Sequence, residues 1–403
     1  MKQIYFLFFL LGFMSTSLAQ TFTVDNIDYN VTSSVVPLTV EVGFNPYAFD
    51  NVTIPTTVND GTNDYTVTSI STDAFANDTY MTSITIPNTV TSIGDTAFAG
   101  CSSLATVTIG NAVASLGAYV FNSCTLLTTV VLPDSVTSMS NGVFYGCSGL
   151  TSVTLPNAIT AIPNNTFYNC SNLASITIPN TVESIGNSAF YSCTSLTALS
   201  VPSSVTSIGN NTFMLCSGLT IVVLPESVSS IGTSAFESCS SLSSVTIPST
   251  VTSIGYFAFY SCTNLTTVNC YVSTPLTINA NVFGDIVLSA CTLNVPVGTN
   301  TAYASASVWQ NFGTINGTLG SSSFTISENI KVYPNPTSNN ITIVTKNLTN
   351  VSLKVYDMNG REIMNHKLSE ITNTVDTSNF QTGIYVFSIA SQEGSTVQKV
   401  VKK

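Results

Sequence analysis

Eight cysteines recur every 23 residues, and cysteine is the residue in this chain best suited to metal or redox chemistry. They are Cys101, Cys124, Cys147, Cys170, Cys193, Cys216, Cys239 and Cys262. A zinc site would need clustered ligands with short C-x-x-C pairing, which this period lacks. Disulfides between successive units are geometrically possible, because neighbouring strands place Cα atoms about 5 Å apart. We predict a column of buried, unpaired thiols, because a residue repeated in every unit answers a packing requirement. Cys270 and Cys291 break the period and are the better candidates for any disulfide.

Residues for acid–base or nucleophilic catalysis are scarce. The only histidine is His366, and no lysine or arginine lies between Lys2 and Lys331. Cysteine–histidine and serine–histidine pairs are therefore absent from most of the chain. Glu226 and Glu237 could in principle form a carboxylate pair, but the acids are scattered and lack the spacing of a calcium loop. We predict no enzymatic activity, no catalytic residue, no metal ion and no cofactor.

The 23-residue period predicts a solenoid. A unit this short cannot bury its own apolar face and must stack on its neighbours. Leu150, Val153 and Leu155 alternate with Ser152 and Thr154, which predicts a strand with apolar side chains inward and hydroxyls outward. A proline usually follows the strand and ends its hydrogen-bonded ladder. We expect a mostly β fold of about ten turns, roughly 50 Å long at the spacing of paired strands.

The repeat has the signature of a known family. Leu150, Val153 and Leu155 match the L-x-x-L-x-L strand of leucine-rich repeats, whose Asn or Cys position holds the periodic cysteine here. The longer form I-P-x-x-V-T-S-I-G-x-x-A-F-x-x-C is complete at residues 86–101 and 247–262. The chain thus resembles the BspA-type leucine-rich repeats of bacterial surface proteins. This resemblance implies a right-handed leucine-rich-repeat solenoid and a role in adhesion.

Departures from the repeat mark its two ends. Asp78 stands where the first unit should have its cysteine, and Phe283 arrives one residue late in the last unit. We assign residues 20–64 to an N-terminal β cap and residues 65–316 to the repeats with their C-terminal cap. Such caps are required because an open solenoid end would expose its core.

The N-terminus has the layout of a secretory signal peptide. Lys2 precedes an apolar run at residues 4–11, and small residues follow up to Ala19. We predict a signal peptide over residues 1–19, cleaved after Ala19. An N-terminal membrane anchor is the alternative, but the run is too short to span a bilayer. We expect no membrane-spanning segment after cleavage.

Charge is distributed unevenly. Residues 3–330 hold 15 of the 20 acidic residues and no basic one, a net charge of about −15. Residues 331–403 carry about +3. Nucleic acids and anionic membranes need basic residues on their partners, so this composition excludes binding to either by the repeats. The change of sign near Lys331 marks a domain boundary.

A linker at residues 317–327 precedes a different module at residues 328–403. Alternating strands and a turn at Asn359 and Gly360 predict a small antiparallel β-sandwich. The module resembles the C-terminal sorting domain of type IX secretion. The motif residues are Tyr333, Pro334, Asn335, Pro336, Gly360 and Lys399. The resemblance implies a secreted or surface protein of a Gram-negative bacterium, exported by the type IX secretion machinery. An ordinary carbohydrate-binding or fibronectin-like sandwich is the alternative.

Two features of the predicted solenoid surface could contact a partner. Apolar residues interrupt the outward rows of serine and threonine at Val131, Ala198, Ile221 and Val223. Tyrosines follow the core phenylalanine at Tyr145, Tyr168, Tyr191 and Tyr260. Isolated apolar residues are common on surfaces, and the tyrosines could merely cover the core edge. We nevertheless regard both sets as candidate binding residues.

These observations favour a non-enzymatic, secreted or surface-displayed adhesion protein. One face of its solenoid would bind an extracellular protein or glycan. The alternative is a structural or ice-binding solenoid that uses the Ser/Thr rows. The curvature usual in leucine-rich repeats and the interruptions at Val131 and Val223 count against ice binding.

Overall fold

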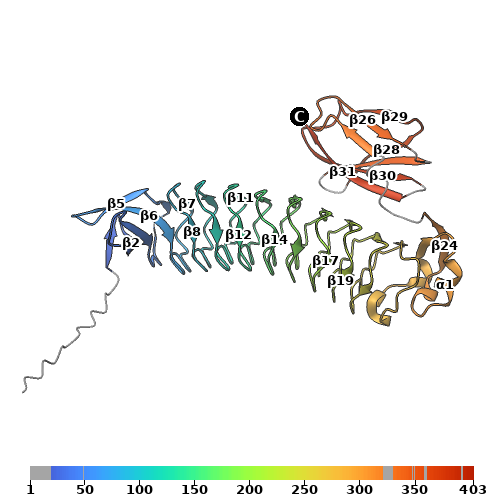
Figure 1. Cartoon of the computed structure of the whole chain (residues 1–403), viewed down its shortest axis with the longest axis horizontal. Coiled ribbons are helices and arrows are strands. Elements are labelled where there is room, and N and C mark those ends of the chain that lie inside the picture. The colour runs from blue at the N-terminus through green and yellow to red at the C-terminus, as the bar shows by residue number, and fades with distance from the viewer. Residues whose placement is uncertain are drawn as a thin grey trace, which may run out of the picture.

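A long rod of stacked turns, gently bent in its C-terminal half, carries a smaller domain beside that half (Figure 1). The computed structural model describes residues 20–48, 50–320, 330–346, 348, 350–357, 361–391 and 394–403. The predicted signal peptide, residues 1–19, lies outside the described residues. The solenoid has about 12 turns at a 23-residue spacing, and ten of them stack a core phenylalanine. The remaining turns belong to the caps.

Short strands close the N-terminal end of the rod. Strands β1 (Thr21–Val24), β2 (Ile27–Ser33) and β3 (Thr39–Val42) pair in antiparallel order. Strand β3 then pairs in parallel with β6 (Asp64–Ile70), which also pairs with β5 (Thr57–Asn59). This arrangement turns an antiparallel cap into the parallel stacking of the repeats.

Asp78 joins the cap to the first full turn. Its buried carboxylate accepts hydrogen bonds from the backbone N–H groups of Tyr80 at 2.8 Å, Met81 at 3.0 Å, and Ala48. A thiol could not accept three such bonds. The first turn therefore replaces the periodic cysteine with a residue that binds the cap.

Two rows of parallel strands run along the rod, and each row is divided into separate hydrogen-bonded sheets. We call the first the hydroxyl sheet, because its outward positions hold the Ser/Thr rows. Its strands are β4 (Asn51–Thr53), β7 (Ser83–Thr85), β9 (Thr106–Thr108), β11 (Thr129–Val131), β13 (Ser152–Thr154), β16 (Ala198–Ser200), β18 (Ile221–Val223), β20 (Ser244–Ile247), β22 (Thr267–Cys270), β23 (Thr292–Pro296) and β24 (Thr314–Leu319). Between β13 and β16 the rung at residues 175–177 forms no strand.

The second sheet consists of two-residue strands after β6. They are β8 (Ser92–Ile93), β10 (Ser115–Leu116), β12 (Ser138–Met139), β14 (Ala161–Ile162), β15 (Ser184–Ile185), β17 (Ser207–Ile208), β19 (Ser230–Ile231) and β21 (Ser253–Ile254). Partners along the regular turns stand 23 residues apart, such as Ser115 and Ser138. The sequence period is thus the hydrogen-bonding register.

Two columns fill the core between the sheets. The phenylalanine rings of successive turns stack with centroids 5.2 to 5.6 Å apart. Beside them, each periodic cysteine donates its S–H to a phenylalanine carbonyl 26 residues earlier, at 2.9 to 3.2 Å. All ten cysteines are free and buried, which confirms the unpaired thiol column. Cys270 and Cys291 are not paired either: their sulfurs contact the Tyr303 hydroxyl at 3.2 Å and the Leu265 carbonyl at 3.0 Å.

A small cap with short helices closes the C-terminal end. Its helices are η1 (Ala280–Phe283), η2 (Leu288–Ala290), α1 (Asn300–Ser305) and η3 (Trp309–Asn311). The Trp309 indole N–H donates to the Leu276 carbonyl at 2.8 Å, so a large ring covers the last turn with its polar atom satisfied. Strand β24 continues through Leu319, so residues 317–319 of the predicted linker belong to this cap.

The C-terminal domain consists of antiparallel sheets, as predicted. One contains β25 (Ile330–Tyr333), β26 (Asn340–Thr345) and β29 (Thr372–Asp376). The other contains β27 (Val351–Asp357), β28 (Glu362–Leu368), β30 (Gly383–Ser391) and β31 (Gly394–Lys402), in the order β28-β27-β30-β31. Ile341, Leu353 and Phe387 belong to its core, which is separate from that of the solenoid.

Candidate binding surface

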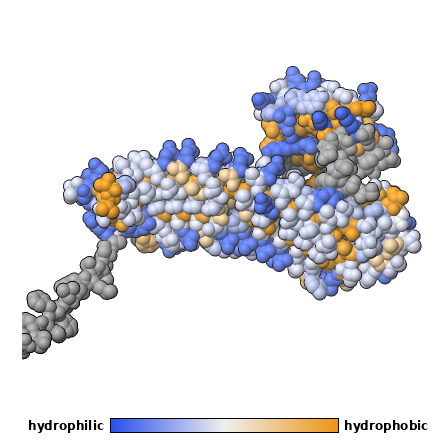
Figure 2. Space-filling model, in the orientation of Figure 1, coloured by the Kyte–Doolittle hydropathy of each residue, from blue (hydrophilic) through white to orange (hydrophobic). Residues whose placement is uncertain are grey.

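The face of the solenoid seen in Figure 2 is mostly of intermediate hydropathy, with scattered hydrophilic and hydrophobic residues. Near the C-terminal cap, asparagines replace the hydroxyl residues. The Asn294 amide donates to Asn269 at 2.8 Å, and the Asn316 amide donates to Asn294 at 3.2 Å. This amide ladder was not predicted, although asparagine recurs at the threonine position of three successive rungs.

The predicted apolar interruptions form one patch and one isolated residue. Ala198 on β16 is directly paired with Ile221 on β18, and Val223 is paired with Ser200. We call Ala198, Ile221 and Val223 the apolar patch. Val131 lies on β11, three rungs from β16, and its side chain is 66% exposed. The structure therefore brings three of these four residues together.

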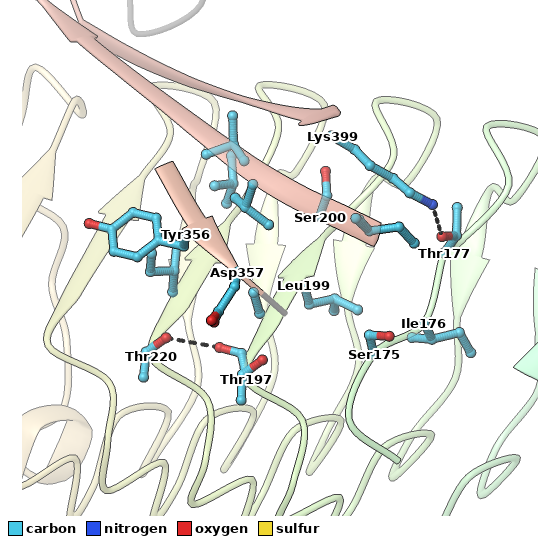
Figure 3. A pocket seen from close by; sticks show the side chains of 16 residues that line it. Ser175, Ile176, Thr177, Thr197, Leu199, Ser200, Thr220, Tyr356, Asp357 and Lys399 are labelled. Atoms are coloured by element: carbon cyan, nitrogen blue, oxygen red, sulfur yellow. Dashed lines mark hydrogen bonds between the residues drawn. The ribbon is translucent and has the colours of Figure 1, made fainter. Parts of the chain in front are cut away.

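The C-terminal domain lies over the apolar patch. All three patch residues are only partly exposed, and they line a cavity of about 140 Å³ between the solenoid and the C-terminal domain. Figure 3 shows this cavity, with Tyr356 and Lys399 approaching from the domain and Leu199 and Thr177 from the rod. The patch is therefore not open surface in this chain.

Three of the four predicted tyrosines form a continuous row. The rings of Tyr145 and Tyr168 stack at 4.5 Å, and those of Tyr168 and Tyr191 at 4.4 Å, all nearly parallel. Tyr119 meets Tyr145 edge-on at 5.8 Å and extends the row. We call these four residues the tyrosine row. Tyr260 lies apart and packs edge-on against Phe257 at 5.4 Å.

Tyr119 escaped the sequence analysis because it occupies another position of the repeat. It stands two residues before core Phe121, whereas the other three tyrosines follow their core phenylalanine directly. Its backbone has a positive φ of 55°. Gly142, 23 residues later, leaves room for the ring: a Cβ there would lie 2.3 Å from the Tyr119 side chain. Sequence spacing alone gave no indication of this contact.

The tyrosine row presents ring edges and hydroxyls rather than ring faces. Its rings are half-buried, and each stacked face is covered by the next ring. Burial, together with the neighbouring Tyr168, raises the pKa of Tyr145 above its usual value. Burial likewise raises the pKa of Tyr168, so these two hydroxyls stay protonated at neutral pH and can both donate and accept hydrogen bonds.

The predicted secretion motif is assembled from both ends of the C-terminal domain. The Asn335 side chain donates to the Lys399 carbonyl at 2.6 Å and accepts from the Val401 N–H at 2.9 Å. Tyr333 is 49% exposed, and cis peptide bonds precede Pro334 and Pro336. The predicted motif residue Gly360 lies outside the described residues. Asn335 thus joins the opening of the domain to the basic final strand.

The candidate chemical groups do not form a site in the part of the chain that the structure describes. There, no cluster of histidine, cysteine and acidic residues could hold a metal ion. Glu226 binds the Ser249 hydroxyl at 2.8 Å, whereas Glu237 occupies the repeat position of the tyrosines. Among the same residues, no helix has the length and apolar character needed to cross a membrane.

Models of known protein families match both the repeats and the C-terminal domain. The family model of the BspA type leucine rich repeat region matches six copies over residues 68–197 and 183–306, more than half of the chain. The chain belongs to the BspA-type leucine-rich repeat family. A second model, the secretion system C-terminal sorting domain, matches residues 331–403. Neither is an enzyme family.

Solved structures with related repeats overlap with this BspA-type protein only in part. A leucine rich cell surface protein from Faecalibacterium prausnitzii is 26% identical, covers 74% of this chain and 94% of its own, and has a TM-score of 0.43. A leucine-rich repeat protein from Bacteroides ovatus is 25% identical, with 73% and 99% covered and a TM-score of 0.31. No curated protein matches the chain. At these TM-scores the overlaps carry no functional argument.

The sorting domain determines how the BspA-type protein is handled. Its match implies processing by the type IX secretion machinery. It also implies secretion or a location on the outer-membrane surface.

Proposed function

We propose that this chain is a non-enzymatic adhesion or binding protein that contacts an extracellular partner through the tyrosine row. The stacked row on a BspA-type solenoid is the observation that supports this proposal most directly. Tyrosine combines a large, rigid apolar ring with a hydrogen-bonding tip, and it is enriched at protein interfaces for that reason. The proposal also agrees with delivery to the cell exterior.

The geometry of the row favours a protein over a glycan as the partner. A sugar ring packs best on a free aromatic face, but both faces of Tyr168 and one face each of Tyr145 and Tyr191 are covered by a stacked ring. Ring edges and hydroxyls, by contrast, suit the mixed apolar and polar surface of a protein. The net charge of about −15 over residues 3–330 further favours a partner with basic residues around its contact surface.

Binding of residues 20–403 to matrix proteins, glycans and neighbouring cell surfaces tests the proposal. Replacing both Tyr145 and Tyr168 with serine removes two adjacent rings, and we expect affinity to fall at least about tenfold, as for interface hot spots. Tyr260→Ser is the matched control and should bind normally, because Tyr260 lies outside the row. Absence of any protein ligand, or equal loss in the control, would contradict the proposal.

An ice-binding solenoid is the second candidate, and one observation favours it. The N-terminal half of the rod is nearly straight rather than continuously curved, although the rod bends toward β17 and β19 (Figure 1), so curvature counts less against this alternative over that half. However, the hydroxyl rows are interrupted at Val131 and in the apolar patch, and residues 175–177 form no strand. Thermal hysteresis of the purified chain would establish ice binding, and its absence would remove this candidate.

A further inference from the structure

We propose that the apolar patch is a docking site whose occupant in the full chain is its own C-terminal domain. Ala198, Ile221 and Val223 on the rod meet Ile384, Val386 and Val397 of the domain across the cavity between them. This contact is independent of the tyrosine row and of the function proposed for it. Contact with the C-terminal domain explains why apolar residues interrupt the hydroxyl rows at this place.

The solenoid departs from its own repeat at this place. Ile176 is equivalent to the buried residues Val153 and Leu199 of the neighbouring turns, yet it is only partly buried and lines the cavity. The rung at residues 175–177 also forms no strand, which opens the hydroxyl sheet beside the patch. Ile176 from a core position of the repeat and the apolar patch from outward positions therefore line the same cavity.

The sheet of the C-terminal domain is apolar on both faces where it meets the patch. On β30, Tyr385 and Phe387 point into the domain core, while Ile384 and Val386 alternate with them on the opposite face. An antiparallel sheet with one solvated face normally carries polar residues there. Without a cover, this second apolar face would be exposed to water at a cost proportional to its area.

Polar and charged groups complement the apolar contact. The Lys399 ammonium donates to the Thr177 hydroxyl at 2.7 Å, joining residues 222 positions apart in the chain (Figure 3). At longer range, the net charge of about −15 on residues 3–330 attracts the charge of about +3 on residues 331–403. The contact therefore has an apolar centre, a hydrogen bond at its rim and favourable charge.

The contact is a docking of two folded parts rather than a shared core. The solenoid and the domain have separate hydrophobic cores, and the cavity of about 140 Å³ shows that their junction is not packed as tightly as a protein interior. Interfaces of this kind within one chain open and close. While the domain is docked, no external partner can reach the apolar patch.

Cross-linking of engineered cysteines tests the docking, because the ten native thiols are buried. In residues 20–403, the pair Thr177→Cys and Lys399→Cys should be joined within one chain by a short bis-maleimide. The pair Thr108→Cys and Lys399→Cys is the matched control, since Thr108 occupies the same row three rungs away. We expect at least a fivefold lower yield from the control pair.

Substitution of the patch provides the second arm. Adding Ile221→Asp to the Thr177/Lys399 pair should lower the yield at least fivefold, whereas adding Val131→Asp should leave it unchanged, because Val131 lies outside the contact. If Ile221→Asp unfolds the chain, Val386→Asp on the domain side replaces it with the same expectation. Equal yields from both cysteine pairs, or no effect of the folded patch variant, would overturn the proposal.

Discussion

At the scale of single residues, the turns beside the core phenylalanines require left-handed backbone. Asn169, Ser192 and Leu215 adopt φ values of 56°, 58° and 63° at equivalent positions, and Gly146 adopts 68°. Only glycine enters this region without strain, and asparagine tolerates it better than most residues. The repeat therefore requires a positive φ at this position, although glycine, asparagine, serine and leucine all occur there.

This restriction can be tested at Asn169, whose side chain is exposed. Asn169→Val should lower the free energy of unfolding by about 1–2 kcal/mol, because a β-branched residue is strained at positive φ. Asn169→Gly is the matched control and should change stability little, since Gly146 already occupies the preceding equivalent position. Denaturant unfolding measures both variants. Equal stability of the valine and glycine variants would show that the position is not strained.

At the scale of the elements, the repeating turn explains the column of buried cysteines, and contact with the N-terminal cap explains why Asp78 replaces the cysteine in the first turn. A cysteine sulfur donates to one carbonyl of the preceding turn, whereas Asp78 accepts from the Ala48 N–H of the cap and from the N–H groups of Tyr80 and Met81 in its own turn. The same position of the repeat thus changes from hydrogen-bond donor to acceptor where the solenoid begins. The residue type at this position therefore depends on whether the nearby backbone offers a free carbonyl group or free N–H groups.

Restoring the repeat residue at this position should therefore be harmful. Asp78→Cys should lower the free energy of unfolding by about 2–4 kcal/mol, because buried N–H groups lose their acceptor at about 1–3 kcal/mol each. Asp134→Cys is the control, because Asp134 is exposed and its contact with the Asn157 N–H is long, at 3.4 Å. Denaturant unfolding again provides the measurement. A fully stable Asp78→Cys variant would refute the capping role.

The thiol column should make the solenoid sensitive to alkaline pH. Burial raises the pKa of Cys147 from 9.0 to about 12, and that of Cys216 to about 12 as well. Below pH 9 both folded and unfolded chains keep these protons, so the stability is fully present. Between pH 9 and 12 only the unfolded chain releases them, and each thiol then lowers the free energy of unfolding by about 1 kcal/mol per pH unit.

Urea unfolding at pH 8, 9, 10 and 11 measures this loss. The Cys147→Ala variant starts from lower stability, because it lacks the sulfur that fills the core and satisfies the Phe121 carbonyl. Its decline above pH 9 should nevertheless be shallower than that of the native chain by the contribution of one thiol. Parallel declines in the two proteins would mean that Cys147 does not keep its proton in the folded state.

At the scale of the whole molecule, an acidic rod and a basic sorting domain are two folded parts with separate cores. The rod presents the tyrosine row, while the domain covers the apolar patch. The two candidate binding surfaces therefore differ in their surroundings: the patch lines the cavity beneath the C-terminal domain, whereas no tyrosine of the row lines that cavity. This difference is why the proposed function rests on the tyrosines.

The sequence by itself determined the features that repeat. Residues 23 apart become neighbours in the stack, so the spacing of the cysteines was enough to predict the solenoid, its buried thiols and its capped ends. The sorting domain was likewise recognisable, because its motifs lie in order along the chain.

Only the tertiary structure decided which surface residues meet. It separated Val131 from the apolar patch, added Tyr119 to the tyrosine row and placed the C-terminal domain over Ile221. These contacts depend on the direction of individual side chains and on the approach of residues more than 200 positions apart. The repeat period does not predict such contacts, whereas it directly predicts the stacking of similar turns.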